Sequence, residues 1–425
     1  MMHLRLRATL AVAAGSLTFL AACSAGTPAS PQATSVTQLP ATTTDTAPIT
    51  EAPANTTPPS PAVSSSASAP ASAAGNSCTA TTNALPLGER IGQLLMVGMQ
   101  PAAAPRGLDG TLTTYRVGSV IYLGGWQGQA KVAATSSHLQ SLVTGSTRLL
   151  IAADQEGGQV QQLKGSGFTP LPSALAQGSL SSATLTTLGR TMAGELRAAG
   201  VNVNLAPVGD TVPAGTEKTN GPIGRYSRQF GSDPTPVAQS VATLVTVMQE
   251  GDKVVATVKH FPGIGRITGN TDTTASGISD SAMRVDDPSL QPFAAAISAK
   301  VGMVMVSSAR YPLLDPGAQA LFSKAIVTDL LRGRLGFHGV VITDDVGAAK
   351  AVADVPVGAR AVRFIDAGGD IVLTANPAQV PTMVAALKAE AAAHPAFAAK
   401  IDAAAARVLA LKARFGLATC SQRAR

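Results

Sequence analysis

Short apolar runs alternate with segments of helical periodicity from about residue 90 to the end of the chain. Eight of these runs lack the strict alternation of a half-exposed sheet, which favours parallel strands covered on both faces. They are Leu94–Met99, Ser119–Leu123, Leu149–Ala153, Val201–Ala206, Val254–Lys259, Met303–Ser307, Val340–Thr343 and Ile371–Thr374.

Three of the intervening segments show clear helix ends. One begins with Pro236 after Thr235 and stops at Gly251, a second stops at Gly200, and a third starts at Ser323 and ends near Gly336. Strands that alternate with helices indicate βαβ units and a parallel sheet. Eight such units predict an α/β fold with a single (β/α)8 TIM barrel, although periodicity alone also permits an open doubly wound sheet.

The N-terminal residues have a different pattern. Residues 1–22 combine Arg5 and Arg7 with a short apolar run, which is typical of a secretory signal peptide. Cys23 follows Leu-Ala-Ala as in the bacterial lipobox, whose thiol is acylated. We therefore expect a secreted lipoprotein that is anchored to the outer face of the cell membrane only through the lipid on Cys23.

Residues 23–77 are rich in Ser, Thr, Ala and Pro and contain no aromatic residue, Lys or Arg. Such a segment buries too little apolar surface to offset the entropy of ordering it, so we expect a disordered tether. The remaining cysteines, Cys78 and Cys420, bracket the patterned region. We predict that they form a disulfide at the two ends of one domain, 78–420, followed by a short tail, 421–425.

The formal net charge of +7 and the isoelectric point near 9.5 do not indicate a nucleic-acid-binding protein. The Lys and Arg residues are scattered, and no basic run is interleaved with aromatic residues. The positive charge could instead attract the protein to an anionic cell wall or membrane. No metal-ligand spacing and no cofactor motif appears, so we expect neither a metal nor a cofactor.

Polar residues follow the predicted strands at their carboxyl ends, where the catalytic residues of (β/α)8 barrels lie. Each of them could instead have an ordinary structural role; Asp345, for example, could cap the next helix. Their convergence on one rim nevertheless indicates a functional site. They are Asp154 and Glu156 after the third strand, Asp210 after the fourth, Lys259 and His260 at the fifth, Ser307 and Ser308 at the sixth, and Asp344 and Asp345 after the seventh.

Three motifs carry a resemblance to a known family. They are Asp154-Gln155-Glu156-Gly157-Gly158, Lys259-His260-Phe261-Pro262-Gly263 and the stretch from Gly339 to Asp345. In family order, over roughly residues 85 to 415, the chain resembles glycoside hydrolase family 3, above all its single-domain β-N-acetylglucosaminidases of the NagZ type.

The resemblance implies a retaining exo-acting enzyme that releases terminal β-GlcNAc through a covalent glycosyl-aspartate. It implies that Asp344 is the nucleophile and that the sugar is held by Asp154, Arg228, Lys259 and His260. The partners that it implies are GlcNAc-containing fragments of the cell wall.

Two positions depart from the family pattern. Gln162 stands where the family has a sugar-binding arginine, and the loop after Gly263 lacks the family's acid/base histidine. Counted without gaps, Asp272 takes the place of this histidine; with two residues inserted, Thr274 does. A carboxyl can exchange a proton near neutral pH and a threonine hydroxyl cannot, so we predict that Asp272 is the acid/base.

Other functions remain open at this stage. The missing histidine also fits a lipoprotein that binds wall sugars without cleaving them. A Schiff-base lyase could use Lys259, and a transferase or phosphorylase could have the same fold. The single tryptophan, Trp126, is expected to be a packing residue, and the scarcity of aromatic residues favours a pocket for one terminal sugar over a long polysaccharide cleft.

Overall fold

The computed structural model describes residues 75–420 except 144 and 252. The expected signal peptide 1–22, the lipidation of Cys23, most of the tether and the tail 421–425 lie outside the described residues. The tether was expected to reach residue 77, but helix α1 (Gly75–Asn83) already begins at Gly75. The physical reason is that Cys78 on α1 is bonded to Cys420, which holds this turn against the folded unit.

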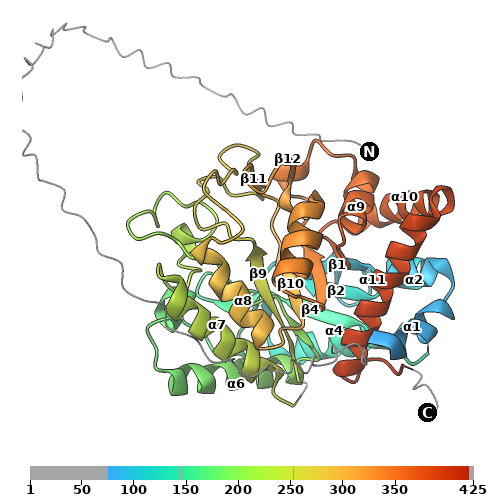
Figure 1. Ribbon diagram of the computed structural model, residues 1–425. Helices are drawn as coiled ribbons and strands as arrows, with labels where there is room; N and C mark the ends of the chain where they lie inside the picture. The colour runs from blue at the N-terminus through green and yellow to red at the C-terminus, as the bar shows by residue number, and fades with distance from the viewer. Residues whose placement is uncertain (1–74, 144, 252, 421–425) are drawn as a thin grey trace, which may run out of the picture. The chain divides into compact units, whose positions relative to one another are not determined.

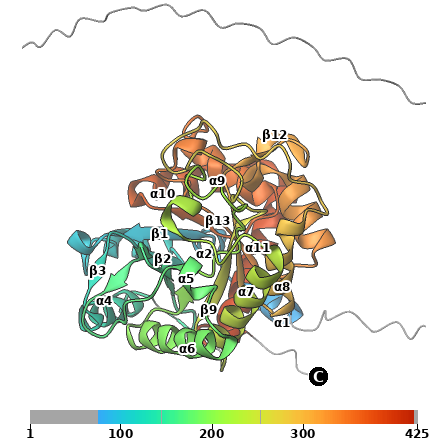
Figure 2. The same ribbon diagram turned by 90° about the vertical axis from the view of Figure 1, so that its left-hand side faces the viewer.

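Eight parallel strands form the interior of the protein, and all of their residues are buried (Figures 1 and 2). The order around the sheet is β13-β10-β9-β8-β4-β2-β1-β14. The strands are β1 (Leu95–Met99), β2 (Ser119–Tyr122), β4 (Leu150–Ala153), β8 (Val203–Asn204), β9 (Val255–Phe261), β10 (Met303–Val306), β13 (Val340–Thr343) and β14 (Val372–Thr374).

The sheet closes on itself. A parallel bridge joins Ile342 of β13 to Ile371 beside β14, and the Thr343 amide donates to the Ile371 carbonyl at 3.0 Å. Closure excludes the open doubly wound sheet that periodicity alone permits, and the predicted (β/α)8 barrel is confirmed.

The fourth strand is shorter than the predicted Val201–Ala206. Backbone bonds to the neighbouring strand continue on both sides of it, because the amides of Asn202 and Leu205 donate to the carbonyls of Ile151 and Ala153, both at 2.9 Å. The side-chain oxygens of Asn202 and Asn204 accept from the amides of Ile151 at 2.8 Å and Gln155 at 3.1 Å. Asparagine side chains thus add to the backbone bonds at this point of the barrel.

Helices cover the outside of the barrel (Figures 1 and 2). They are α2 (Leu87–Gln93), α3 (Asp109–Tyr115), α4 (Gln129–Ser141), α5 (Ala174–Gln177), α6 (Ser182–Ala198), α7 (Pro234–Gln249), α8 (Gln291–Ser298), the π-helix η5 (Ala325–Arg334), α9 (Val357–Asp366), α10 (Val380–Ala393) and α11 (Pro395–Arg414). None of the helices among the described residues combines the length and the apolar character needed to cross a membrane.

Short elements occupy the connections between these helices and strands. The extended ones are β3 (Trp126–Gln127), β5 (Gln155–Gly157), β6 (Val160–Gln161), β7 (Leu163–Lys164), β11 (Arg310–Tyr311) and β12 (Asp315–Gln319). The 3-10 turns are η1 (Pro101–Ala103), η2 (Gly224–Tyr226), η3 (Pro288–Leu290), η4 (Ala320–Phe322), η6 (Lys350–Val352) and η7 (Pro377–Gln379).

Two helix starts differ from the predicted ones. Helix α7 begins at Pro234 because the Asp233 carboxylate caps it, accepting from the Thr235 amide at 2.9 Å. The helix predicted from Ser323 begins at Ala325. The Ser323 hydroxyl precedes it and accepts from the Ile326 amide at 3.2 Å, as a residue that flanks a helix does.

The two ends of the described chain meet at α1 and α11, which lie side by side in Figure 1. The disulfide between Cys78 and Cys420 has a Cα–Cα distance of 4.9 Å and joins residues 342 positions apart. A loop of this length gives an entropic stabilisation of at most about 6 kcal/mol in the chain-entropy model. Trp126 is fully buried and its ring centroid lies 4.5 Å from that of Tyr122, which confirms it as a packing residue.

Candidate active site

A pocket of about 410 Å³ opens at the carboxyl ends of the barrel strands. Its wall brings together all six side chains that the sequence singled out for catalysis and sugar binding. Two come from strand ends, two from β9 and two from loops, so only the closed barrel makes them neighbours. They are Asp154, Arg228, Lys259, His260, Asp272 and Asp344.

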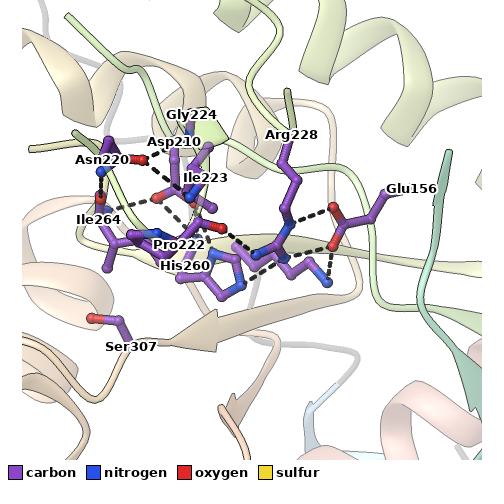
Figure 3. Close-up of polar contacts among 12 residues, drawn as sticks. Glu156, Asp210, Asn220, Pro222, Ile223, Gly224, Arg228, His260, Ile264 and Ser307 are labelled. Atoms are coloured by element: carbon purple, nitrogen blue, oxygen red, sulfur yellow. Dashed lines mark hydrogen bonds and ion pairs between the residues drawn. The ribbon is translucent and has the colours of Figure 1, made fainter. Parts of the chain in front are cut away.

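A buried carboxylate, that of Glu156, organises one side of the pocket (Figure 3). Its two oxygens accept from Nε and Nη2 of Arg228, both at 2.8 Å, and Oε1 lies 2.6 Å from Nζ of Lys259. Burial alone would raise the pKa of Glu156, but the positive charges of Arg228 and Lys259 outweigh it and lower the pKa to about 2. Glu156 is therefore a permanent anion that holds two cations.

Lys259 is itself almost completely buried and pairs with a second carboxylate, that of Asp154. Burial would lower the pKa of Lys259, but the charges of Asp154 and Glu156 overcome this effect and raise it. A lysine that stays protonated is a hydrogen-bond donor and not an amine nucleophile. This arrangement argues against the Schiff-base lyase.

His260 is oriented by Asp210, which is fully buried. The Asp210 carboxylate lies 2.7 Å from Nδ1 of the ring and also accepts from the amide of Ile264 at 2.8 Å. The opposite ring nitrogen, Nε2, lies 3.4 Å from Nη2 of Arg228 (Figure 3). Asp210 thus fixes the histidine ring and the start of the following loop together.

The loop after β9 carries Asp272 and is held at its start and at Asp272 itself. Nδ2 of Asn220 donates to the carbonyls of Ile264 at 2.9 Å and Ile267 at 2.7 Å. Further along, the amide of Lys350 donates to the Asp272 carbonyl at 3.1 Å. Because Lys350 follows the strand that ends in Asp344, this bond ties the Asp272 loop to the segment after β13.

Asp272 stays accessible at the mouth of the pocket, yet its pKa is raised to about 6. The first cause is the protein around its carboxyl, which excludes water, and the second is the negative charge of Asp344. Thr274, the alternative residue of the sequence alignment, is not part of the pocket wall, and its hydroxyl accepts from the Ser276 amide at 2.9 Å.

Asp344 and Asp345 differ in their surroundings although they are adjacent. The Asp345 carboxylate accepts from the amides of Gly347 at 2.7 Å, Ala348 at 3.0 Å and Ala375 at 2.8 Å. Asp345 therefore ties two strand-end loops together. Because these amides occupy the oxygens of Asp345, the Asp344 carboxylate is the more available of the two to a molecule bound in the pocket.

Gln162, which stands in place of the family's arginine, also lines the pocket. Its side-chain oxygen accepts from the Gly125 amide at 3.0 Å. The side chain thus supports the loop after β2.

Sequence reasoning placed Glu156 and Asp210 on the rim but gave neither a role. Their position at strand ends was the available signal, and the signal says nothing about which cation each carboxylate meets. Asn220 was missed altogether, because an isolated asparagine directly before Gly221 looks like any other turn residue.

Known proteins with a similar sequence or structure indicate the family to which the chain belongs. The model of the family described as "Glycosyl hydrolase family 3 N terminal domain" matches residues 86–411. A protein from Xanthomonas oryzae pv. oryzae named "Beta-hexosaminidase" is 33% identical over 281 residues, which cover 64% of this chain and 80% of that protein.

Two solved structures are similar to the chain. One is that of the beta-N-acetylhexosaminidase from Beutenbergia cavernae, 45% identical with a TM-score of 0.74, covering 77% of this chain and 99% of that one. The other is a glycoside hydrolase family 3 beta-N-acetylglucosaminidase from Paenibacillus, 30% identical with a TM-score of 0.70, covering 80% of this chain and 65% of that one.

Replacing Glu156 by Gln should destabilise the protein, because the change leaves Arg228 and Lys259 buried with too little negative charge. The expected loss is about 3–5 kcal/mol in the free energy of unfolding at pH 7, measured by urea denaturation. The pKa of Glu156 is 4.5 without the protein environment and about 2 in the folded protein. In the wild type, this stabilisation is therefore present above pH 4.5 and is lost as the pH falls toward about 2.

The matched control is Glu250→Gln. Glu250 forms an exposed ion pair with Arg190 at 3.1 Å, and exposed pairs contribute little. The role given to Glu156 would be wrong if the two variants unfolded at the same urea concentration.

Proposed function

The chain belongs to glycosyl hydrolase family 3, and from this premise we propose that it is a retaining exo-β-N-acetylglucosaminidase, a β-N-acetylhexosaminidase that releases terminal β-GlcNAc. It is a glycoside hydrolase that acts on O-glycosyl bonds. The names of its relatives, beta-hexosaminidase and beta-N-acetylhexosaminidase, support the choice of sugar.

One observation carries the mechanism: two carboxyl groups share the pocket, and the charge of Asp344 contributes to the raised pKa of Asp272. A retaining glycosidase needs this division between a carboxylate nucleophile and a protonated acid. Asp344, at the end of a rigid strand, is suited to attack the anomeric carbon. Asp272, with a pKa of about 6, can donate its proton to the departing oxygen.

The second half of the reaction reverses these roles. After the leaving group departs, the sugar is bonded to the Asp344 carboxylate and Asp272 is ionised. Asp272 then takes a proton from water as the water oxygen attacks the anomeric carbon and the bond to Asp344 breaks. The sugar keeps its configuration, and both carboxyl groups return to their starting states.

The sugar would be held by the charged side of the pocket. Asp154 accepts hydroxyl hydrogens, whereas Lys259 and Arg228 donate to hydroxyl oxygens, and charge-assisted bonds of this kind suit a polar ring. His260 presents Nε2 on the same side. Among the residues that the structure describes, none of those in the pocket wall is Phe, Tyr or Trp, which supports recognition of one terminal sugar over stacking along a polysaccharide.

The natural substrate that we propose is a GlcNAc–MurNAc fragment of peptidoglycan, met outside the cell. The support is the lipobox pattern at Cys23 and the signal-like residues 1–22 before it. Fractionation of expressing cells should find the wild type with the membrane and the Cys23→Ser variant released. An identical distribution of the two would contradict lipid anchoring.

A fluorinated glycosyl fluoride should trap the intermediate on Asp344. Peptide mapping by mass spectrometry should find one adduct, located on Asp344, because the intermediate forms quickly and its hydrolysis is slowed by the fluorine. The variant Asp345→Asn is the control and should still be labelled. An adduct on Asp345 or Glu156, or binding of the sugar without any turnover, would refute the assignment.

Replacing Asp272 by Ala should slow substrates with poor leaving groups by about 10²–10⁴-fold and activated aryl glycosides much less. Azide should restore part of the rate, because this anion can attack the anomeric carbon of the intermediate in place of water and has no proton that a base must remove. In the wild type, kcat/KM should fall as the pH rises through about 6, because the first step needs protonated Asp272.

The matched control lies two residues away on the same loop. Thr274→Ala should keep the activity and the pH profile of the wild type, since Thr274 is not part of the pocket wall. An equal loss on both kinds of substrate for Asp272→Ala, or no loss, would remove Asp272 from the mechanism.

A further inference from the structure

A second cavity, of about 240 Å³, lies at the opposite pole of the barrel from the catalytic pocket. Its wall includes Gln93, Gly118 and Leu149, each of which directly or nearly precedes the first residue of a barrel strand. Helices α1, α2 and α11 border it, and Figure 1 shows these three helices together. The catalytic reaction uses none of these residues.

A lysine of this wall, Lys412 on α11, is fully buried. Its Nζ donates to Oε1 of Gln93 at 2.6 Å and to the Gly118 carbonyl at 2.9 Å. Both acceptors are neutral, and no carboxylate among the described residues is paired with this ammonium group. Lys412 therefore lacks the counter-charge that Lys259 has at the other pole. This is unusual, because buried lysines are rare unless they are paired.

The remaining charges of the wall are mostly positive. Arg116 and Arg148 are exposed at the cavity, and Glu89 is the acidic residue of its wall. With Lys412 protonated, the cavity has a net positive charge. Ser146 and Thr147 add hydroxyl groups to the same wall. Guanidinium and ammonium groups together with hydroxyls are the donors that carboxylates and tetrahedral oxyanions require.

We propose that this cavity binds a small oxyanion, a carboxylate or a sulfate- or phosphate-like group, as the counter-ion of Lys412. Because Lys412 is fully buried, the anion would accept from the guanidinium groups of Arg116 and Arg148 at the open side of the cavity and would offset the charge of the ammonium group behind the cavity wall. It would join α11 to the segments before β2 and β4 and so stabilise the pole at which the disulfide closes the domain.

Burial lowers the pKa of Lys412 to about 7, which agrees with a cation whose partners among the described residues are all neutral. An anion in the cavity favours the charged ammonium. Binding of the anion and protonation of Lys412 therefore support each other, and only the folded protein has the site.

Thermal unfolding of the whole protein, in chloride and in millimolar sulfate or acetate at equal ionic strength, tests the proposal. One of the two oxyanions should raise Tm by about 2–4 °C at ten times its apparent Kd, and the effective one identifies the class of ligand. Lys412→Met should abolish this rise. Its Tm in chloride should equal or exceed that of the wild type, because an uncompensated buried charge is removed.

Two further variants make the result decisive. Lys253→Met removes an exposed lysine elsewhere and should respond to the anion as the wild type does. Arg116→Gln alters only the exposed edge of the cavity and should weaken the apparent affinity about tenfold, so the test stands even if Lys412→Met fails to fold.

The proposal would be overturned if neither oxyanion raised Tm above its value in chloride. It would equally be overturned if Lys412→Met kept the rise in Tm. The same holds if Arg116→Gln bound the anion with unchanged affinity. A surviving rise would place the anion elsewhere, as in the catalytic pocket, which also contains Lys259 and Arg228.

Discussion

The buried carboxylate of Glu156 is the interaction on which the sugar-binding side of the pocket depends. It holds two cations from distant segments, Arg228 from a loop and Lys259 from β9, within 2.8 Å of its oxygens. Three charged groups can remain buried here because each charge faces an opposite one. With their positions set in this way, Lys259 meets Asp154, and Arg228 lies beside His260.

The two carboxyl groups of the proposed mechanism are positioned by different means. Asp344 ends a barrel strand, so the sheet itself sets its place. Asp272 lies on a loop whose path is held by Asn220 and by a backbone bond to Lys350 beyond β13. The loop brings Asp272 close enough to Asp344 for the negative charge of Asp344 to raise the pKa of Asp272. The neighbouring Asp345 instead ties two loops together through bonds to their amides.

The two poles of the barrel treat buried lysine in opposite ways. At the catalytic end, Lys259 lies between two carboxylates, and its pKa is raised despite burial. At the other end, Lys412 has only amide and carbonyl oxygens, and burial lowers its pKa to about 7. The contrast shows that the identity of the partner, rather than depth alone, decides the charge state of a buried amine.

The sequence by itself determined the strand count, the order of strands and helices, and the rim on which the polar residues gather. Apolar runs and strand-end motifs are local signals, and they led to Asp154, Lys259, His260 and Asp344. The resemblance to the family added Arg228 and Asp272, and the small number of cysteines led to the pairing of Cys78 with Cys420. Element ends were less predictable: the fourth strand is shorter than its apolar run, and the side chains of Asn202 and Asn204 make bonds to the neighbouring segment that no propensity describes. Only the tertiary structure decided that the sheet closes, that Glu156 holds both cations and that Asp272 rather than Thr274 faces the pocket. These features depend on distances between segments far apart in the chain, and electrostatic energies vary with those distances and with the exclusion of water, neither of which a linear pattern records.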